Sequence, residues 1–250
     1  MEKIWNLKKQ GDPNEIKHLS AALNVNMTIA RLLVQRGIKT FNEAKVFFRP
    51  RLSDLHNPFL MKDMDKAVER LELAIARQEK ILIYGDYDVD GTTSVALMYI
   101  FLKERINHLE YYIPNRYSEG YGISPHSIDF AVENGFTLVI ALDCGIKAVD
   151  KITQAQQRGL DFIICDHHNP DEKVPPAVAV LDPKQSDCNY PYKDLSGCGV
   201  GFKLLQAYCQ KNDVELEEIY DLLDLVVVSI ASDIVPITGE NRVLAYYGLK

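Results

Sequence analysis

The stretch Leu160-Asp161-Phe162-Ile163-Ile164-Cys165-Asp166-His167-His168 contains the clearest structural signal in the chain. Its first six residues are nearly continuous hydrophobics, which is typical of a strand covered on both faces of a parallel sheet. The aspartate and two histidines that follow are residue types that bind metals. A surface loop, or a helix N-cap before Pro170, would also account for them. This stretch alone therefore leaves the metal hypothesis open.

The segment that begins at Ile81 alternates between short apolar runs and helical patterns. We expect strands over residues 81–84, 109–113, 137–142, 161–165 and 177–181. Helices are expected between most of them, over residues 92–106, 125–134 and 147–158. Strands that alternate with helices predict an α/β fold, with a parallel β-sheet flanked by helices on both faces. Ligands of such open sheets gather beyond the carboxyl ends of the strands.

The first 60 residues carry helical patterns instead. Apolar residues at helical spacing predict a helix over residues 20–36, which ends at Gly37. A second short helix is expected over residues 41–48, and an amphipathic helix over residues 63–78 precedes the sheet. The sequence thus predicts a helical N-terminal segment, 1–60, followed by an α/β domain, 61–250.

Composition narrows the class of protein. Hydrophobic residues make up 47% of the 250 residues, and no apolar stretch approaches the roughly 18 residues of a membrane span. The five cysteines form no Cys-x-x-Cys pair, which favours reduced thiols in a cytoplasm over a disulfide framework. The net charge of −7 argues against a generic basic nucleic-acid binder. It leaves room for one that uses metal ions or a local basic groove.

Four acidic motifs follow apolar runs that we expect to be strands. They are Asp86-Tyr87-Asp88-Val89-Asp90-Gly91, Asp143, Asp166-His167-His168, and Asp233 after the apolar run 226–232. Helix capping is the better explanation for any single aspartate after a strand. Four such sites in one sheet are better explained by a shared metal site.

Carboxylate oxygens with imidazole nitrogens favour Mn²⁺ or Mg²⁺. Two such ions, about 3.5–4 Å apart, would lower the pKa of a bridging water and neutralise charge on a phosphoryl oxygen, so phosphoester hydrolysis is the matching reaction. The first motif is not an EF-hand loop, because an apolar helix follows where a glycine and a glutamate are required. A P-loop and a serine nucleophile elbow are excluded because their signatures are missing from the sequence.

Together, the four motifs resemble those of the DHH phosphoesterases. The residues around the first and fourth motifs are similar to those of the RecJ branch, whose members are single-stranded-DNA exonucleases. Pro114-Asn115-Arg116 with Glu119-Gly120-Tyr121-Gly122, and Gly197-Cys198-Gly199-Val200-Gly201, are also similar to that branch. The resemblance covers about residues 50–250.

The resemblance implies a 5′-to-3′ single-stranded-DNA exonuclease of recombination and repair, which releases mononucleotides by two-metal hydrolysis. Asp143 would bridge the two Mn²⁺ or Mg²⁺ ions, and His168 would bind the scissile phosphate. Asp90 would be a further ligand or a supporting group. The remaining ligands would be Asp86, Asp88, His167 and Asp233.

Other implications of the resemblance concern the nucleic acid and the domains. Arg116 would contact a phosphate, and Gly199 and Gly201 would let the backbone approach one; a solvent-exposed arginine and helix–sheet packing are the competing interpretations. Tyr84 stands where many relatives carry a histidine. Residues 61–250 would form the DHH catalytic domain, and no DHHA1-type substrate domain follows in this chain.

The resemblance also leaves two alternative functions open. One is a DHH phosphoesterase that acts on short oligonucleotides, cyclic dinucleotides or phosphoadenosine phosphate. The other is a catalytically dead DNA-replication module, similar to relatives that have lost metal ligands. For the exonuclease, the expected partners are single-stranded DNA, a single-stranded-DNA-binding protein and a recombination helicase, with no membrane.

Overall fold

The computed structural model describes residue 4 and residues 6–250. The chain divides into two compact units, one that ends at Arg51 and one that begins at Leu52. Among the described residues, no helix is long and apolar enough to cross a membrane.

The described part of the smaller unit contains three helices, α1 (Pro13–Leu23), α2 (Met27–Val34) and α3 (Phe41–Phe48). The helix over 41–48 was predicted with these bounds, and a capping box between Thr40 and Glu43 fixes its start. Helices α1 and α2 bury a small core of their own, formed by Ile16, Leu19, Ala30, Leu33 and Val34.

The prediction of one helix over residues 20–36 is wrong, because the chain turns between α1 and α2. Asn24 adopts a left-handed conformation with φ of 51°, which ends α1. Asn26 then starts α2 by accepting a hydrogen bond from the amide of Ile29 at 2.9 Å. The apolar spacing continues across this break, so the pattern alone did not reveal it.

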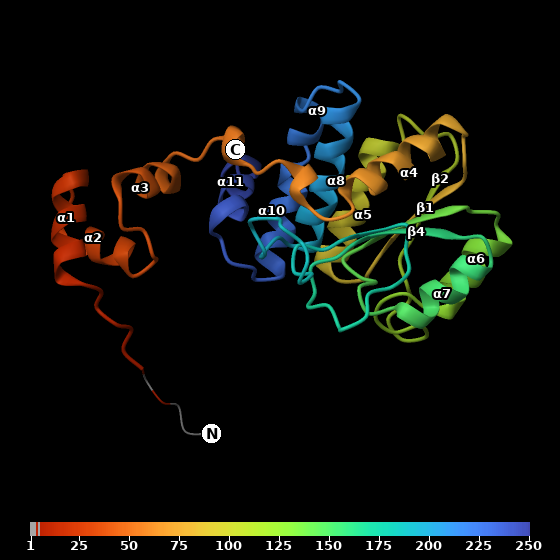
Figure 1. The fold of residues 1–250 in the computed structure, drawn as a ribbon, viewed down its shortest axis with the longest axis horizontal. Coiled ribbons are helices and arrows are strands. Elements are labelled where there is room, and N and C mark those ends of the chain that lie inside the picture. The colour runs from red at the N-terminus through yellow and green to blue at the C-terminus, as the bar shows by residue number, and fades with distance from the viewer. Residues whose placement is uncertain (1–3, 5) are drawn as a thin grey trace. The chain divides into compact units, whose positions relative to one another are not determined.

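The larger unit contains a parallel sheet with the strand order β2-β1-β3-β4-β5 (Figure 1). All four neighbouring pairs are parallel, which confirms the predicted sheet. The strands are β1 (Ile81–Gly85), β2 (Leu109–Tyr112), β3 (Leu138–Leu142), β4 (Asp161–Cys165) and β5 (Ala179–Leu181).

The strand order contains a switch point between β1 and β3. The chain leaves β1 toward β2 through α5 (Val89–Leu102), then returns past β1 to β3 through α6 (Pro125–Glu133) and reaches β4 through α7 (Val149–Gln157). Right-handed crossovers in opposite directions place helices on opposite faces. Helices α6 and α7 accordingly lie together below the sheet in Figure 1, with α5 above it. Such a switch point opens a crevice at the carboxyl ends of the strands.

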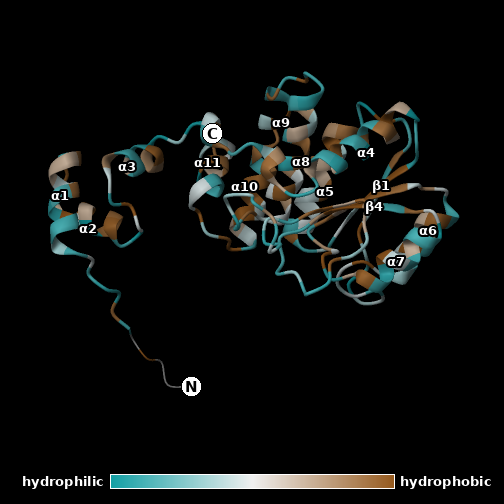
Figure 2. Ribbon diagram, in the orientation of Figure 1, coloured by the Kyte–Doolittle hydropathy of each residue, from teal (hydrophilic) through white to brown (hydrophobic). Residues whose placement is uncertain are grey.

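Each face of the sheet packs into a separate apolar layer. Alternate strand residues such as Ile83 and Ile140 face α5, while Leu82 and Val139 face α6 and α7. The central strands β1 and β3 are therefore apolar on both faces, and the hydrophobic colour of β1 is visible in Figure 2. The face toward α5 is further covered by α4 (Met64–Ala76) and α8 (Gly197–Lys211), and α9 (Glu217–Tyr220) packs on α8.

The larger unit begins nine residues before the predicted start of the α/β domain at residue 61. Two short 3₁₀ helices occupy this stretch, η1 (Leu52–Asp54) and η2 (Pro58–Leu60). The second packs against α4 and α8, and the first against α11 (Gly239–Gly248). Residues 52–60 thus pack on helices of the larger unit.

The prediction that residues 226–232 form a strand is wrong, because they belong to helix α10 (Leu223–Ser232). The run is apolar because α10 packs against α5, α8 and α11, on several sides at once. A short apolar run with β-branched residues does not distinguish a buried strand from a buried helix. Asp233 therefore follows a helix, as its C-cap.

A buried ion pair ties α8 to α11. The Nζ atom of Lys203 lies 3.0 Å from Oε1 of Glu240, and both side chains are at most 1% exposed. Lys203 also donates to the carbonyl of His56 at 2.8 Å, and Tyr190 donates its hydroxyl to Glu240 at 2.6 Å. These bonds fix the start of α11. They therefore also fix the C-terminal end of the loop, residues 233–238, that connects α10 to α11.

Candidate metal centre

Two carboxylates lie side by side at the switch point. Asp86 follows β1 and Asp143 follows β3, and the register pairs the last residues of these strands, Gly85 with Leu142. Both side chains are almost fully buried. Asp143 has a φ of 59°, unusual for a residue with a side chain, and its amide donates to the carbonyl of Cys165 at 2.8 Å. The fold thus specifies where these two aspartates lie.

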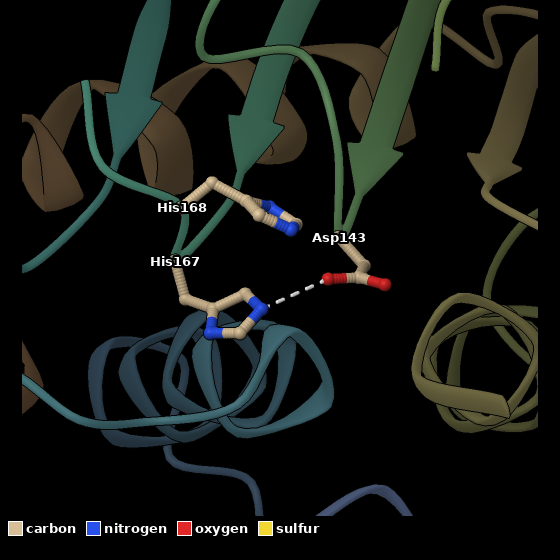
Figure 3. Close-up of side chains that lie close together, drawn as sticks. All are labelled: Asp143, His167 and His168. Atoms are coloured by element: carbon tan, nitrogen blue, oxygen red, sulfur yellow. Dashed lines mark ion pairs between the residues drawn. The ribbon is translucent and has the colours of Figure 1, made fainter. Parts of the chain in front are cut away.

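His167 brings the other acidic motifs to this point. Its Nε2 atom lies 3.2 Å from Oδ1 of Asp143, the pair drawn with a dashed line in Figure 3. The same nitrogen lies 3.7 Å from Asp90 and 3.6 Å from Asp233. The ligand-type atoms form two groups, each within 4.8 Å, and His167 belongs to both: Asp143 with His167 and His168, and Asp90 with His167 and Asp233.

Several buried polar atoms in this group lack a hydrogen-bond partner among the described residues. They are Oδ2 of Asp86, Oδ1 of Asp143 and both ring nitrogens of His167. A buried polar atom without a partner costs about 1–3 kcal/mol, so such a group needs an explanation. Hard oxygens with imidazole nitrogen suit a divalent cation, and cations at this point would give the carboxylate oxygens and Nε2 of His167 the partners they lack. The residues therefore fit a metal centre.

The electrostatics of the cluster agree with this interpretation. Burial, together with the charges of Asp90, Asp88 and Asp166, raises the pKa of Asp143 to about 10. Burial likewise raises the pKa of Asp86. Carboxylates packed this closely without a cation repel each other's charge and hold protons instead. A bound cation would reverse that balance.

His168 points into the same group from the other side (Figure 3). Its Nδ1 donates to Oδ1 of Asp166 at 2.7 Å, and its Nε2 lies 3.2 Å from the hydroxyl of Tyr121. The bond to Asp166 raises the pKa of His168. Burial opposes ionisation of Asp166, but the bond and charge of His168 and the amide of Ile146 outweigh it, so the pKa of Asp166 is lowered. Both pKa shifts favour the ion pair, and the hydrogen bond fixes the orientation of the His168 ring.

Asp90 lies in the first turn of α5, because that helix begins at Val89 and not at Thr92 as predicted. Its carboxylate accepts hydrogen bonds from the amides of Gly197 and Cys198, at 2.7 and 2.8 Å, and from the hydroxyl of Ser229 at 2.7 Å. Asp90 thus anchors the N-terminus of α8, where a negative charge is favoured. It keeps one oxygen toward His167.

The two remaining predicted ligands lie nearer to solvent. Asp88 is exposed and caps α5 by accepting from the amide of Gly91 at 2.9 Å, and its charge is near enough to raise the pKa of Asp143. Asp233 is 32% exposed at its side chain. Burial raises the pKa of Asp233, and His167 opposes that effect. Both aspartates lie at the open side of the cluster.

The predicted phosphate contacts lie at different depths. Arg116 is exposed, with its guanidinium 5.2 Å from the centre of the Tyr87 ring. Gly199 and Gly201 are buried in α8, and the nearest neighbours of an added Cβ would be Ser196 and Leu142, respectively. The Gly201 contact is with β3, as in helix–sheet packing, whereas the Gly199 contact is with the residues just before α8. Tyr84 is buried and donates its hydroxyl to the carbonyl of Gly122 at 2.8 Å.

Three residues of the centre were quoted in motifs but given no role. They are Tyr121 and Asp166, which hold His168, and Gly197, whose added Cβ would lie 2.6 Å from Cβ and Oδ1 of Asp143. The glycine pattern of residues 197–201 was the available signal for Gly197. Its first glycine, rather than its second and third, approaches the centre.

Fold and site together define an α/β protein with a carboxylate and histidine centre for divalent cations at a switch point. More specifically, the chain belongs to the DHH family: the sequence model of the DHH family, N-terminal domain, matches residues 80–230.

The chain is also similar to RecJ proteins. It is 41% identical to the single-stranded-DNA-specific exonuclease RecJ of Bacillus subtilis, over 98% of this chain and 30% of that protein. It is 32% identical to RecJ of Escherichia coli, over 89% of this chain and 40% of that protein. The crystal structure of RecJ from Thermus thermophilus in complex with Mn²⁺ superposes with a TM-score of 0.79 and 26% identity, over 96% of this chain and 34% of that one. The chain thus spans less than half of these relatives.

Proposed function

We propose that this chain is the catalytic core of a metal-dependent phosphodiesterase that degrades single-stranded DNA from its 5′ end to mononucleotides. One observation carries the proposal: two groups of cation ligands share His167, and buried oxygens and nitrogens in them lack partners. Two adjacent cations are the arrangement that phosphodiester hydrolysis uses. Residues 61–250 would then be the DHH catalytic domain.

The resemblance assigns Asp86, Asp88, Asp143, His167 and Asp233 as the ligands that would hold the two cations, Mn²⁺ or Mg²⁺. Of these, Asp143, His167 and Asp233 belong to the two groups of ligand atoms, together with Asp90 and His168. When bound, the cations would activate a water and neutralise charge on the phosphoryl group. The alternative, a catalytically dead binding module, is similar to relatives that have lost metal ligands. The presence of these ligands in this chain argues against it.

The protein's own side chains would orient the phosphate. His168 is fixed between Asp166 and Tyr121, and its raised pKa favours the protonated ring. A protonated imidazole beside Asp143 donates to a phosphate oxygen and stabilises the charge that grows there during hydrolysis. Arg116, at the exposed edge, would grip a neighbouring phosphate with its planar guanidinium. The substrate strand would thus be held on both sides of the bond that is cleaved.

The choice of substrate comes from the relatives, which are named single-stranded-DNA-specific exonucleases. Digestion from the 5′ end, a role in recombination and repair, and a cytoplasmic location belong to the same proposal. So do the partners, a single-stranded-DNA-binding protein and a recombination helicase.

Incubation with Mn²⁺ and 5′-labelled single-stranded DNA tests the activity. Wild type should release labelled mononucleotide early, and Asp143→Ala should not, because a buried ligand of the centre is lost. The matched control is Asp221→Ala, which removes an exposed carboxylate at the C-cap of α9. That variant should match wild type.

Full activity of Asp143→Ala at equal metal loading would refute the role of the centre. A dinucleotide in the same assay separates the substrate classes. Cleavage of the dinucleotide without release from the long strand would favour the alternative DHH phosphoesterase of short substrates.

A further inference from the structure

A pocket of about 530 Å³ lies beside the metal centre. Tyr121 and His168 line it, and both also belong to the centre: the Tyr121 hydroxyl lies 3.2 Å from Nε2 of His168 and donates to the carbonyl of Asp143 at 3.3 Å. The pocket and the centre therefore share a wall. A group that fills the pocket would be attached within a few bonds of a phosphate held at His168.

The pocket lining combines buried apolar side chains with charged ones, among them the buried Asp166 and the partly buried Lys151. Ile123, Cys144 and Ile146 are buried side chains of its lining, and the backbone of residues 145–149 forms another part. Lys147 is exposed at the lining and pairs with Asp171 at 3.6 Å. An exposed ion pair of this kind is weak, so the ammonium is free to exchange its partner for a phosphate. The lining thus suits a flat apolar group that carries an anion.

Aromatic and cationic groups lead from the exposed edge toward this pocket. The guanidinium of Arg116 lies over the ring of Tyr87, whose centre lies 6.3 Å from that of Tyr121 in an edge-to-face contact. Aromatic rings flanked by cations are the features that bind unpaired nucleotides, because every base offers a face for stacking. The order Arg116, Tyr87, Tyr121 then places the pocket next to a path for a single strand.

We propose that this pocket binds one nucleoside next to the scissile phosphate, with the base against Tyr121 and the apolar lining. The proposal rests on the proposed phosphodiesterase function. The volume lies within the ~300–1,000 Å³ of pockets for small molecules, enough for a nucleoside. Lys147 would contact the next phosphate, since phosphate contacts fix the register of a nucleic acid.

The pocket would also select against duplex DNA. A base bound with its face against Tyr121 and its edge against residues 145–149 would have that edge covered by protein. A paired base would first have to unstack and unpair, at a cost of a few kcal/mol. Single-strand preference would then begin at the centre itself.

Two chromogenic substrates test the proposal: the p-nitrophenyl ester of thymidine 5′-monophosphate, and bis(p-nitrophenyl) phosphate, which lacks a nucleoside. Ala148 lines the pocket at the start of α7, so Ala148→Leu and Ala148→Trp fill it to increasing degrees. Gln154→Trp adds the same ring to the exposed side of α7 and is the control. Mn²⁺ binding by each variant is measured first, so that only variants with an intact centre are compared.

The expected result is a loss of kcat/KM for the nucleoside ester of about tenfold or more in Ala148→Trp, with a smaller loss in Ala148→Leu. The ester without a nucleoside should change less than about twofold, and Gln154→Trp should behave as wild type. If the ratio of kcat/KM for the two esters were the same in Ala148→Trp as in wild type, the proposed nucleoside pocket would be refuted.

Failure of the phosphodiesterase proposal has a different signature, because Mn²⁺-loaded wild type would then hydrolyse neither ester. In that case, calorimetric binding of thymidine 5′-monophosphate decides the question of the pocket. Tighter binding by wild type than by Ala148→Trp would support it, and equal affinities would overturn it.

Discussion

Replacing Gly197 by alanine would place a methyl group against the carboxylate of Asp143. The added Cβ would lie 2.6 Å from Cβ and Oδ1 of Asp143, whereas ordinary contacts begin near 3.4 Å. The two groups must therefore separate by about 0.8 Å, and close-packed interiors transmit such strain. The perturbation acts directly on the residue that we place between the two cations.

Neither side of this contact can move freely. The amide of Asp143 is bonded to β4, and the start of α8 is bonded to Asp90 through the amides of Gly197 and Cys198. We expect the carboxylate to move, and a misplacement of about 1 Å at a reacting centre costs roughly 100-fold. Mn²⁺ affinity and hydrolysis should fall to about this extent, with a loss of about 1–3 kcal/mol in the free energy of unfolding from overpacking.

Calorimetric titration with Mn²⁺ and thermal unfolding measure both effects. The control is Gly199→Ala, because an added Cβ there would meet its nearest atoms at 3.4 to 3.5 Å, an ordinary contact. That variant should bind Mn²⁺ as wild type does and gain up to about 1 kcal/mol from helix propensity. Equal Mn²⁺ affinity of the two variants would refute the claim that Gly197 positions Asp143.

Three further predictions concern charge. Lys203→Met should cost about 3–5 kcal/mol in chemical denaturation, because it leaves a buried carboxylate without its partner; the exposed Lys211→Met on the same helix should cost less than about 1 kcal/mol, and similar losses would contradict the reasoning. Asp166→Asn should lower the pKa of His168 in an NMR titration of the metal-free protein, since the hydrogen bond to Asp166 raises it; an unchanged value would disprove that cause. In the metal-free folded protein the pKa of Asp143 is about 10, whereas in the unfolded chain it is about 4. The free energy of unfolding of the metal-free protein therefore falls as the pH rises between these two values. Mn²⁺ displaces the proton of the Asp143 carboxyl, so the rise in Tm on adding Mn²⁺ should be larger at about pH 8 than at about pH 6, and the reverse order would contradict it.

The sequence was informative where one pattern has one structural meaning. Residues 161–165 form a strand with the predicted bounds, because a short apolar run between a helical pattern and polar residues suits a central parallel strand. The rule on strand ends accounts for the approach of Asp143 and His167, whose Oδ1 and Nε2 atoms lie 3.2 Å apart. Asp90 and Asp233 reach His167 from a helix start and a helix end, at 3.7 and 3.6 Å.

Other features depend on the three-dimensional arrangement. The run before Asp233 is equally apolar as a helix or a strand, and only its contacts with α5, α8 and α11 decide between them. The choice of Gly197 rather than Gly199 as the residue at the centre depends on the direction in which the first turn of α8 faces. Asp90 looks like its neighbour Asp88 in the sequence, yet one is buried at a helix start and the other is exposed.

The candidate ligands come from segments far apart in the chain, from Asp86 after the first strand to Asp233 after α10. No single motif offers a site on its own, so cation affinity belongs to the folded sheet unit as a whole. A cation that binds only this state raises its population by mass action. In a living cell, the abundance of the protein would then follow the supply of manganese or magnesium. Metal starvation would remove molecules through proteolysis of the unfolded chain, in addition to slowing those that remain.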